Sequence, residues 1–565
     1  MARRQSTLIG RRAFLRGVAG VVGAATLTRC APGGGMDGGA SGVVGRPTIR
    51  VQGGSFGFPS PFAYIAAPGY WRMSYLFDTL LWPDASGRQL PWLAASYDRS
   101  DDGMVHRLAL RNATWHDGTP LTPRDVVFTF DYFASQHLSP LAIAAPRSVA
   151  KAVETGERTV EIRLEHPDAN FTQAVLGSVP IIPEHVWSKI DDAQIASGDE
   201  ALIGTGPYHL QSRSEAHGRE LYVANDDFFL GTPFVQRIEM TPVDDELVAV
   251  RAGQLDGGQA PVEGARNDVL DPFRQDPAFG VISNQTAFAF PLYFNLRRGG
   301  ALADVRFRQA CLMAIHREDL VQRLLTGNGT VGSAGFLPPG HPYHVEVDPY
   351  NHDTGAANRL LDDAGYRRTS PDGVRQGPDG APLRFTLVVH DTVPPALPEL
   401  VAANLRQVGV DVDRQVVDLV RLFGIKTGAT YDLLINLYPG PVGTTPNGDP
   451  EILRPVYHSQ PPNQLYAATG YANPEVDRLL DRQLTTLDEA ERKEMVGGIQ
   501  RIVARELPVA VLYYTTMFFA FRKQVFDQWY YTTGGFGPGI PDAYNKHAFV
   551  TGQKTGLQIR QAAGQ

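Results

Sequence analysis

The clearest pattern of apolar and polar positions lies between residues 108 and 133. Positions 108–111 alternate between leucine and less apolar residues, which is typical of a half-buried strand. An Asp-Gly pair at 117–118 indicates a turn, and Thr122 followed by proline suits a helix N-cap and first helical position. Asp125 lies in the first turn, where a negative charge is favoured. The stretch therefore predicts a strand, a tryptophan-bearing loop and a capped helix, whose apolar face comprises Val126, Val127, Phe130 and Phe133.

Similar patterns recur to the end of the chain. Helical spacing of apolar residues appears at 70–81 and again at 356–366, where Gly365 suits the position just after a helix. A chain of 565 residues is too long for a single hydrophobic core, so two to four domains or lobes are expected. Further strands are predicted at 160–164, 383–390, 432–438 and 508–514.

Charge and cysteine content exclude several classes of protein. The net charge is −8, but the first 29 residues hold six arginines and no acid, so the remainder carries 46 basic against 60 acidic residues, a net −14. A chain this acidic would repel nucleic acid, and no nucleic-acid partner is expected. Only two cysteines occur, Cys30 and Cys311, which argues against a disulfide scaffold and a cysteine-ligated zinc site.

The N-terminal segment has the features of an export signal. Arg11 and Arg12 open a sequence that resembles a twin-arginine signal, and the apolar region at 17–27 is too short for a transmembrane helix. Residues 27–30 resemble a lipobox whose cysteine, Cys30, would be lipidated, although Arg29 departs from the small residue that this motif prefers. The alternative is a cleaved signal with an incidental cysteine. The glycine-rich stretch 31–46 then predicts a flexible tether.

The 108–133 stretch also resembles a known family. Its Trp-His-Asp-Gly-x-Pro-Leu-Thr-x-x-Asp-Val-x-Phe sequence is similar to a hallmark segment of the family 5 extracellular solute-binding proteins, the receptors of peptide, dipeptide and nickel ABC importers. Further family-like landmarks follow in order, so that the resemblance extends from about residue 47 to about residue 550. They include Gly-Thr-Gly-Pro-Tyr at 204–208, Tyr-Phe-Asn at 293–295, Val-Arg-Phe-Arg-Gln-Ala at 305–310 and the helix at 356–366.

The resemblance implies an α/β, two-lobed fold of the periplasmic-binding-protein type II, or Venus-flytrap, with an extra third domain. Lobe I would be discontinuous and formed by 47–90, 201–288 and 512–560. The extra domain would occupy 91–200, and lobe II would occupy 289–511. The lobes would close by a hinge motion about two crossover strands near 291–295 and 509–514.

The same resemblance implies binding and not catalysis. A monomer in the periplasm, or held by a lipid at the outer face of the cell membrane, would capture a solute between its lobes and deliver it to an ABC permease and its ATPase, without a cofactor. Neither a zinc-protease motif nor a nucleophile elbow occurs to support an enzyme. The residues expected near the ligand are Tyr64, Tyr70, Asn295, Tyr438, Asp449, Tyr513, Tyr514 and Trp529.

The identity of the solute is left open by the loop at 437–450. Peptide-binding members carry an aspartate four residues before its final proline to hold the peptide ammonium, whereas this chain has Pro446 there. Asp449 could serve instead for a peptide, or the solute could lack an amine, as an oligosaccharide does. A third alternative is nickel or a metal chelate, for which His341 and His344 are weak candidate ligands within a histidine- and acid-containing tract.

Overall fold

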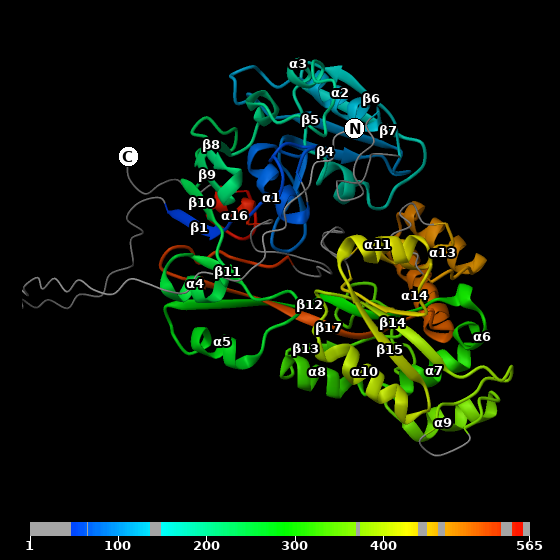
Figure 1. Cartoon of the computed structure of the whole chain (residues 1–565). Coiled ribbons are helices and arrows are strands. Elements are labelled where there is room, and N and C mark those ends of the chain that lie inside the picture. Colours follow the sequence, from blue (N-terminus) through cyan, green and yellow to red (C-terminus); the bar gives the residue numbers. More distant parts are fainter. Residues whose placement is uncertain are drawn as a thin grey trace, which may run out of the picture. The chain divides into compact units, whose positions relative to one another are not determined.

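The computed structural model describes residues 47–64, 66–135, 148–368, 373–438, 449–460, 469–532 and 545–557 (Figure 1). Its first sheet has the order β1-β10-β9-β8, in which β1 is parallel to β10 and the other pairs are antiparallel. Helix α1 (Ala66–Leu76) and the two-stranded sheet β2-β3 accompany it. The strands are β1 (Thr48–Gln52), β2 (Leu81–Pro83), β3 (Gln89–Pro91), β8 (Tyr208–Ser214), β9 (Arg219–Ala224) and β10 (Arg237–Thr241).

The predicted strand-loop-helix stretch belongs to a separate antiparallel sheet of order β4-β5-β7-β6. Helix α2 (Pro123–Ser135) begins where the sequence predicts it, and the Asp125 carboxylate accepts hydrogen bonds from the Thr122 backbone N–H and hydroxyl at 2.9 and 3.0 Å. This is the acidic half of a capping box. The strands are β4 (Ala94–Arg99), β5 (Val105–Leu110), β6 (Val149–Gly156) and β7 (Thr159–Leu164), and the short helix α3 spans Glu184–Trp187.

The largest sheet joins segments that are far apart in the chain. Its order is β11-β17-β12-β16-β14-β15, with β13 paired to β17. The long antiparallel strands β12 and β17 run along each other through two register shifts, and the second shift falls at Pro291, which has no N–H to donate (Figure 1). The strands are β11 (Gly257–Gln259), β12 (Phe279–Phe294), β13 (Gly329–Val331), β14 (Arg384–His390), β15 (Asp411–Val417), β16 (Leu433–Ile435) and β17 (Val509–Arg522).

Strands β14, β15 and β16 are parallel, and helices α10 and α11 connect them as crossovers. Because β14, β15 and β16 are parallel, their carboxyl ends lie at the same edge of the sheet, together with the residues that follow each strand. Helices α6–α9 follow β12 in sequence, and α12–α14 precede β17. The helices are α4 (Glu246–Ala252), α5 (Asn267–Arg274), α6 (Gly300–Ala303), α7 (Val305–Ala314), α8 (Arg317–Leu325), α9 (Thr354–Asp363), α10 (Ala396–Gln407), α11 (Leu419–Thr427), α12 (Arg454–Tyr457), α13 (Pro474–Thr485), α14 (Glu489–Glu506) and α16 (Lys546–Thr551).

A histidine replaces the usual aspartate at the start of α8. His316 is the N-cap residue, and its Nδ1 accepts a hydrogen bond from the Asp319 backbone N–H at 2.9 Å. An imidazole nitrogen thus supplies the acceptor that an aspartate oxygen would provide. Within the described residues, no helix has the length and apolar character needed to span a membrane.

A fully buried ion pair ties the end of the chain to the first sheet region. The Lys546 ammonium lies 2.7 Å from an Asp78 carboxylate oxygen, and neither side chain is exposed. Trp92 Nε1–H and the Thr205 hydroxyl donate to the same carboxylate at 2.8 and 2.9 Å. The ammonium also lies 4.5 Å from the centroid of a Trp82 ring. Every polar atom of this carboxylate is therefore matched, as a buried charge requires.

Candidate ligand-binding site

The edge at which β14, β15 and β16 end carries a buried cation. Lys426 projects from the last turn of α11 and is only 4% exposed. Burial lowers the pKa of its ammonium from 10.5 to about 7. The ammonium lies 5.6 Å from the centroid of the Tyr293 ring, a distance typical of a cation–π interaction. Ligands of open α/β sheets bind outside the carboxyl ends of the strands, and a perturbed titratable group at that edge marks a candidate site.

Polar groups accompany Lys426 at the same edge. Asn436 follows β16 directly and is buried, and its Oδ1 accepts no hydrogen bond from the described residues. His390 ends β14, and its pKa is lowered, chiefly by burial. Buried polar atoms are normally paired in native proteins, so an amide oxygen left open at a sheet edge points to a partner that arrives from outside.

Aromatic side chains line the adjacent core. Phe336 packs edge-on against Tyr438 and Tyr457, with ring centroids 5.2 and 5.7 Å apart. Its φ of 77° is uncommon for a bulky residue, and the Tyr514 hydroxyl holds it by donating to the Phe336 carbonyl oxygen at 2.6 Å. The Tyr457 hydroxyl has no hydrogen-bond partner among the described residues. A strained aromatic residue and an open hydroxyl in the same core cluster as Tyr293 are features that functional sites concentrate.

Two of the residues predicted to contact ligand lie in this aromatic core, namely Tyr438 and Tyr514. The Tyr438 hydroxyl donates to the Ile452 carbonyl at 2.8 Å, and the backbone of Tyr438 pairs with that of Ala289. Asn295 lies close by in sequence to Tyr293, but its side-chain amide donates to the carbonyl oxygens of residues 429 and 431 at 3.0 and 2.7 Å. Asn295 therefore braces the end of β12 in this structure.

The other predicted aromatic residues lie in different places. Tyr513 faces the opposite side of the sheet and stacks on Phe290, with centroids 4.8 Å apart. Trp529 packs on Phe519 in the core of the first sheet region and is not exposed. Tyr64 and Tyr70 contact each other at 6.0 Å in that same core, where the Tyr70 hydroxyl donates to the carbonyl of residue 178. Their contact with a ligand stays a prediction.

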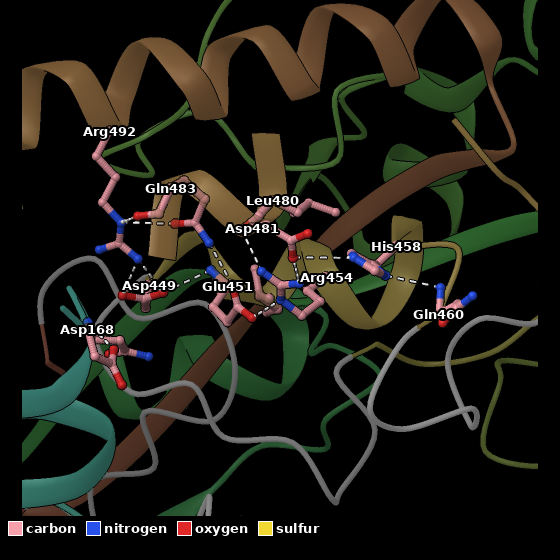
Figure 2. A network of polar contacts seen from close by, with 12 residues as sticks. Asp168, Asp449, Glu451, Arg454, His458, Gln460, Leu480, Asp481, Gln483 and Arg492 are labelled. Carbon is pink, nitrogen blue, oxygen red and sulfur yellow. Dashed lines mark hydrogen bonds and ion pairs between the residues drawn. The ribbon is translucent and has the colours of Figure 1, made fainter. Parts of the chain in front are cut away.

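Asp449 is engaged in a buried network (Figure 2). Both of its carboxylate oxygens lie 3.0 Å from Arg492 Nη2, and one also accepts the Glu451 backbone N–H at 2.8 Å. The side chains of Asp449 and Arg492 are only 5% and 7% exposed. Glu451 is paired with Arg454 and accepts from Gln483 at 2.6 Å, and burial raises its pKa to about 7. An incoming ammonium would have to share Asp449 with Arg492.

The remaining predicted positions are separated or lie outside the described residues. His344 donates from Nδ1 to the Leu337 carbonyl at 2.9 Å, while His341 Nδ1 accepts the Tyr343 backbone N–H at 3.2 Å. Within the described part of the chain, no group of three or more histidine, cysteine or acidic side chains is arranged to hold a metal ion. Pro446, Arg11, Arg12 and Cys30 lie outside the described residues.

Sequence reasoning missed Lys426, Asn436 and Arg492. The sequence does contain a signal for Lys426. This lysine stands four residues after Leu422 and so falls on the apolar face of the helix at 419–427. A lysine at a position where the pattern demands an apolar residue is a reason to look for a function. Asn436 and Arg492 have no comparable signal, since their roles depend on contacts with distant segments.

A mixed α/β fold with a mostly apolar site and a few buried polar groups suits the binding of a solute. The family model described as "Bacterial extracellular solute-binding proteins, family 5 Middle" matches residues 89–464. The chain therefore belongs to the bacterial extracellular solute-binding proteins of family 5, as the hallmark segments predict.

Individual relatives agree with this assignment. The oligopeptide-binding protein AppA of Bacillus subtilis is 24% identical over 75% of this chain and 77% of its own length. Protein XP55 of Streptomyces lividans is 28% identical over 77% of both chains. The structure of NikA from Brucella suis in complex with Fe(III)-EDTA superposes with a TM-score of 0.74 at 21% identity, covering 87% of this chain and 99% of NikA. The predicted fold class, two-lobed with an extra domain, is confirmed by these matches.

Proposed function

We propose that this protein is the solute-receiving subunit of an ABC importer and that its solute is a peptide, or a similar molecule, with an anionic group that docks against Lys426. The buried ammonium carries this proposal. A buried ammonium whose pKa is lowered by desolvation is stabilised by an approaching anion, and a peptide carboxylate is such a group. The oligopeptide-binding name of the relative AppA supports a peptide.

The aromatic core beside Lys426 supports an extended organic ligand. Tyr438, Tyr457 and Phe336 offer ring faces and edges, and Asn436 offers an amide for hydrogen bonding. Ligand sites of this kind are mostly apolar with a few polar groups that fix orientation. An oligosaccharide would use the same rings but has no anionic group to bind the Lys426 ammonium, so the peptide is favoured.

We propose the lobe organisation that the sequence predicts, with lobe I at 47–90, 201–288 and 512–560, the extra domain at 91–200 and lobe II at 289–511. The sheet contents support it, because β4 to β7 all fall within 94–164 and the parallel strands all fall within 384–435. Strands β12 and β17 cross the two lobe boundaries and would serve as the hinge.

We further propose that Arg11 and Arg12 direct export and that Cys30 anchors the mature protein to the membrane by a lipid. Intact mass measurement of the membrane-bound protein would test the anchor. A mass increase that is retained in Cys311→Ala and lost in Cys30→Ala is expected, and an unmodified mature N-terminus would contradict it.

Mass spectrometry of the solute released from natively purified protein tests the ligand class directly. A mixture of peptides is the expected result. Calorimetric titration with the recovered peptides should then give weaker binding to Lys426→Met by about tenfold to a hundredfold, the usual loss for a hydrogen bond to a charged group. Recovery of sugars, or of a nickel chelate, would overturn the peptide assignment.

A further inference from the structure

Two loops at one end of the β4-β5-β7-β6 sheet meet the corner between α13 and α14. One loop is the β4–β5 turn, which contains Gly103, and the other follows β7 and contains Asp168 and Ala169. The loops are joined at their base, because the Leu164 backbone N–H donates to the Met104 carbonyl oxygen at 2.9 Å.

The contact with the helix corner is close. The Ala169 N–H donates to the Leu484 carbonyl oxygen in the last turn of α13 at 2.8 Å. Gly103 has a φ of +69°, and a Cβ at that position would lie 2.5 Å from Leu487 Cδ1. The corner itself is fixed, since Asp488 caps α14 by accepting the Glu491 N–H at 2.8 Å. The positive φ favours glycine at this turn, and a side chain there would require the tip of the Leu487 side chain to shift.

Charge opposes the same contact. Burial and, to a lesser degree, the neighbouring Asp449 carboxylate raise the pKa of Asp168 (Figure 2). The Asp168 carboxylate is held in place by the Ser148 hydroxyl at 2.8 Å and by the Asn170 backbone N–H at 2.9 Å. Arg492 is already paired with Asp449, and the neighbouring His166 acts in the opposite direction by lowering the pKa of Asp168. The steric fit and the hydrogen bond therefore stabilise the contact, whereas repulsion between the Asp168 and Asp449 carboxylates destabilises it.

We propose that these two loops form a latch on the α13–α14 corner, and that the balance between fit and repulsion sets how often the ligand-free protein occupies the closed arrangement. The inference rests on the proposed function, because a latch has a use only in a receptor whose lobes open and close. Apparent ligand affinity scales with the fraction of molecules in the binding-competent state, so the latch would tune affinity from outside the ligand site.

Hydrogen exchange of the ligand-free protein at the Ala169 amide tests the latch. Gly103→Ala should speed that exchange by about tenfold, because an added methyl group must displace Leu487. Gly118→Ala is the matched control. Its φ is +85° and it lies in the same sheet region, but an added Cβ meets nothing within 4 Å. Both variants carry the same backbone penalty, so only the latch contact distinguishes them.

Two further variants make the test decisive. In a Leu487→Ala background the effect of Gly103→Ala should vanish, as expected of two positions that act through one contact. Asp168→Asn keeps the shape and removes the charge, so it should raise the protection factor of the Ala169 amide, which corrects for the effect of the neighbouring side chain on intrinsic exchange. Equal exchange in Gly103→Ala and Gly118→Ala, or a lower protection factor in Asp168→Asn, would overturn the latch. Since exchange is measured without solute, this failure is distinct from a failure to recover peptides.

Discussion

Replacing Lys426 with methionine should stabilise the ligand-free protein while weakening solute binding. The lysine is 4% exposed, and the pKa of its ammonium falls from 10.5 to about 7 on burial. At 1.36 kcal/mol per pKa unit, folding the charged lysine costs about 4 kcal/mol at pH 7. Methionine keeps the aliphatic stem but loses the cation–π contact with Tyr293, about 1 kcal/mol. The expected gain in the free energy of unfolding is about 3 kcal/mol.

The pH dependence gives this prediction its sharpest form. Because the pKa of Lys426 is lower in the folded state, the folded state binds fewer protons than the unfolded chain. The cost is therefore fully present below pH 7 and declines as pH rises toward 10.5. Urea unfolding of wild type and Lys426→Met should show the gain shrinking to below about 1 kcal/mol at pH 9.5.

A second buried lysine provides the control. Lys546 is equally hidden but is paired with Asp78, so Lys546→Met leaves a buried carboxylate without its partner. We expect a loss of about 3–5 kcal/mol, opposite in sign to the effect at Lys426. A gain at Lys426 that fails to appear at pH 7, or that grows with pH, would refute the assignment of Lys426 as a cation that burial destabilises in the folded protein.

Three further outcomes are expected. His316→Ala should lower the free energy of unfolding by about 1 kcal/mol through loss of the α8 cap, whereas His316→Asp should restore it; equal stability of the two variants would show that the cap contributes nothing. Arg492→Met should cost about 3–5 kcal/mol, because Asp449 is then buried unpaired, and thermal unfolding without a shift would contradict that pairing. Alanine at both His341 and His344 should leave metal content by elemental analysis unchanged, and a loss of bound nickel would favour the metal alternative.

Local features of the fold were predictable because their causes are local. The strand at 105–110, the turn and the capped helix at 123–135 follow from alternation, an Asp-Gly pair and a Thr-Pro-x-Asp start within a few residues. The cap at His316 shows the limit of such rules. Histidine is not among the residue types that usually cap helices, and only the contact with Asp319 reveals His316 as the cap of α8.

The candidate site was less predictable because it is assembled from distant segments. Lys426 and Tyr293 come together only through the pairing of β12 with β16 and the crossover helix α11. Most of the aromatic residues chosen from the sequence have the size and polarity of ligand-contacting residues, yet the same properties suit a core, where Trp529 lies. Burial and pairing, which separate the two roles, are not encoded in residue type.

The buried pair of Asp78 and Lys546 also imposes an order on folding. The Lys546 ammonium reaches the carbonyl of Phe77 across 469 residues of sequence. Until α16 has been synthesised, Asp78 has no counter-charge, and the core around Trp82 and Trp92 cannot close. Contacts of such high sequence separation form late and slowly. We therefore expect the region around Asp78 to pack fully only after α16 has been synthesised. A truncated product would expose that unfinished core to proteases.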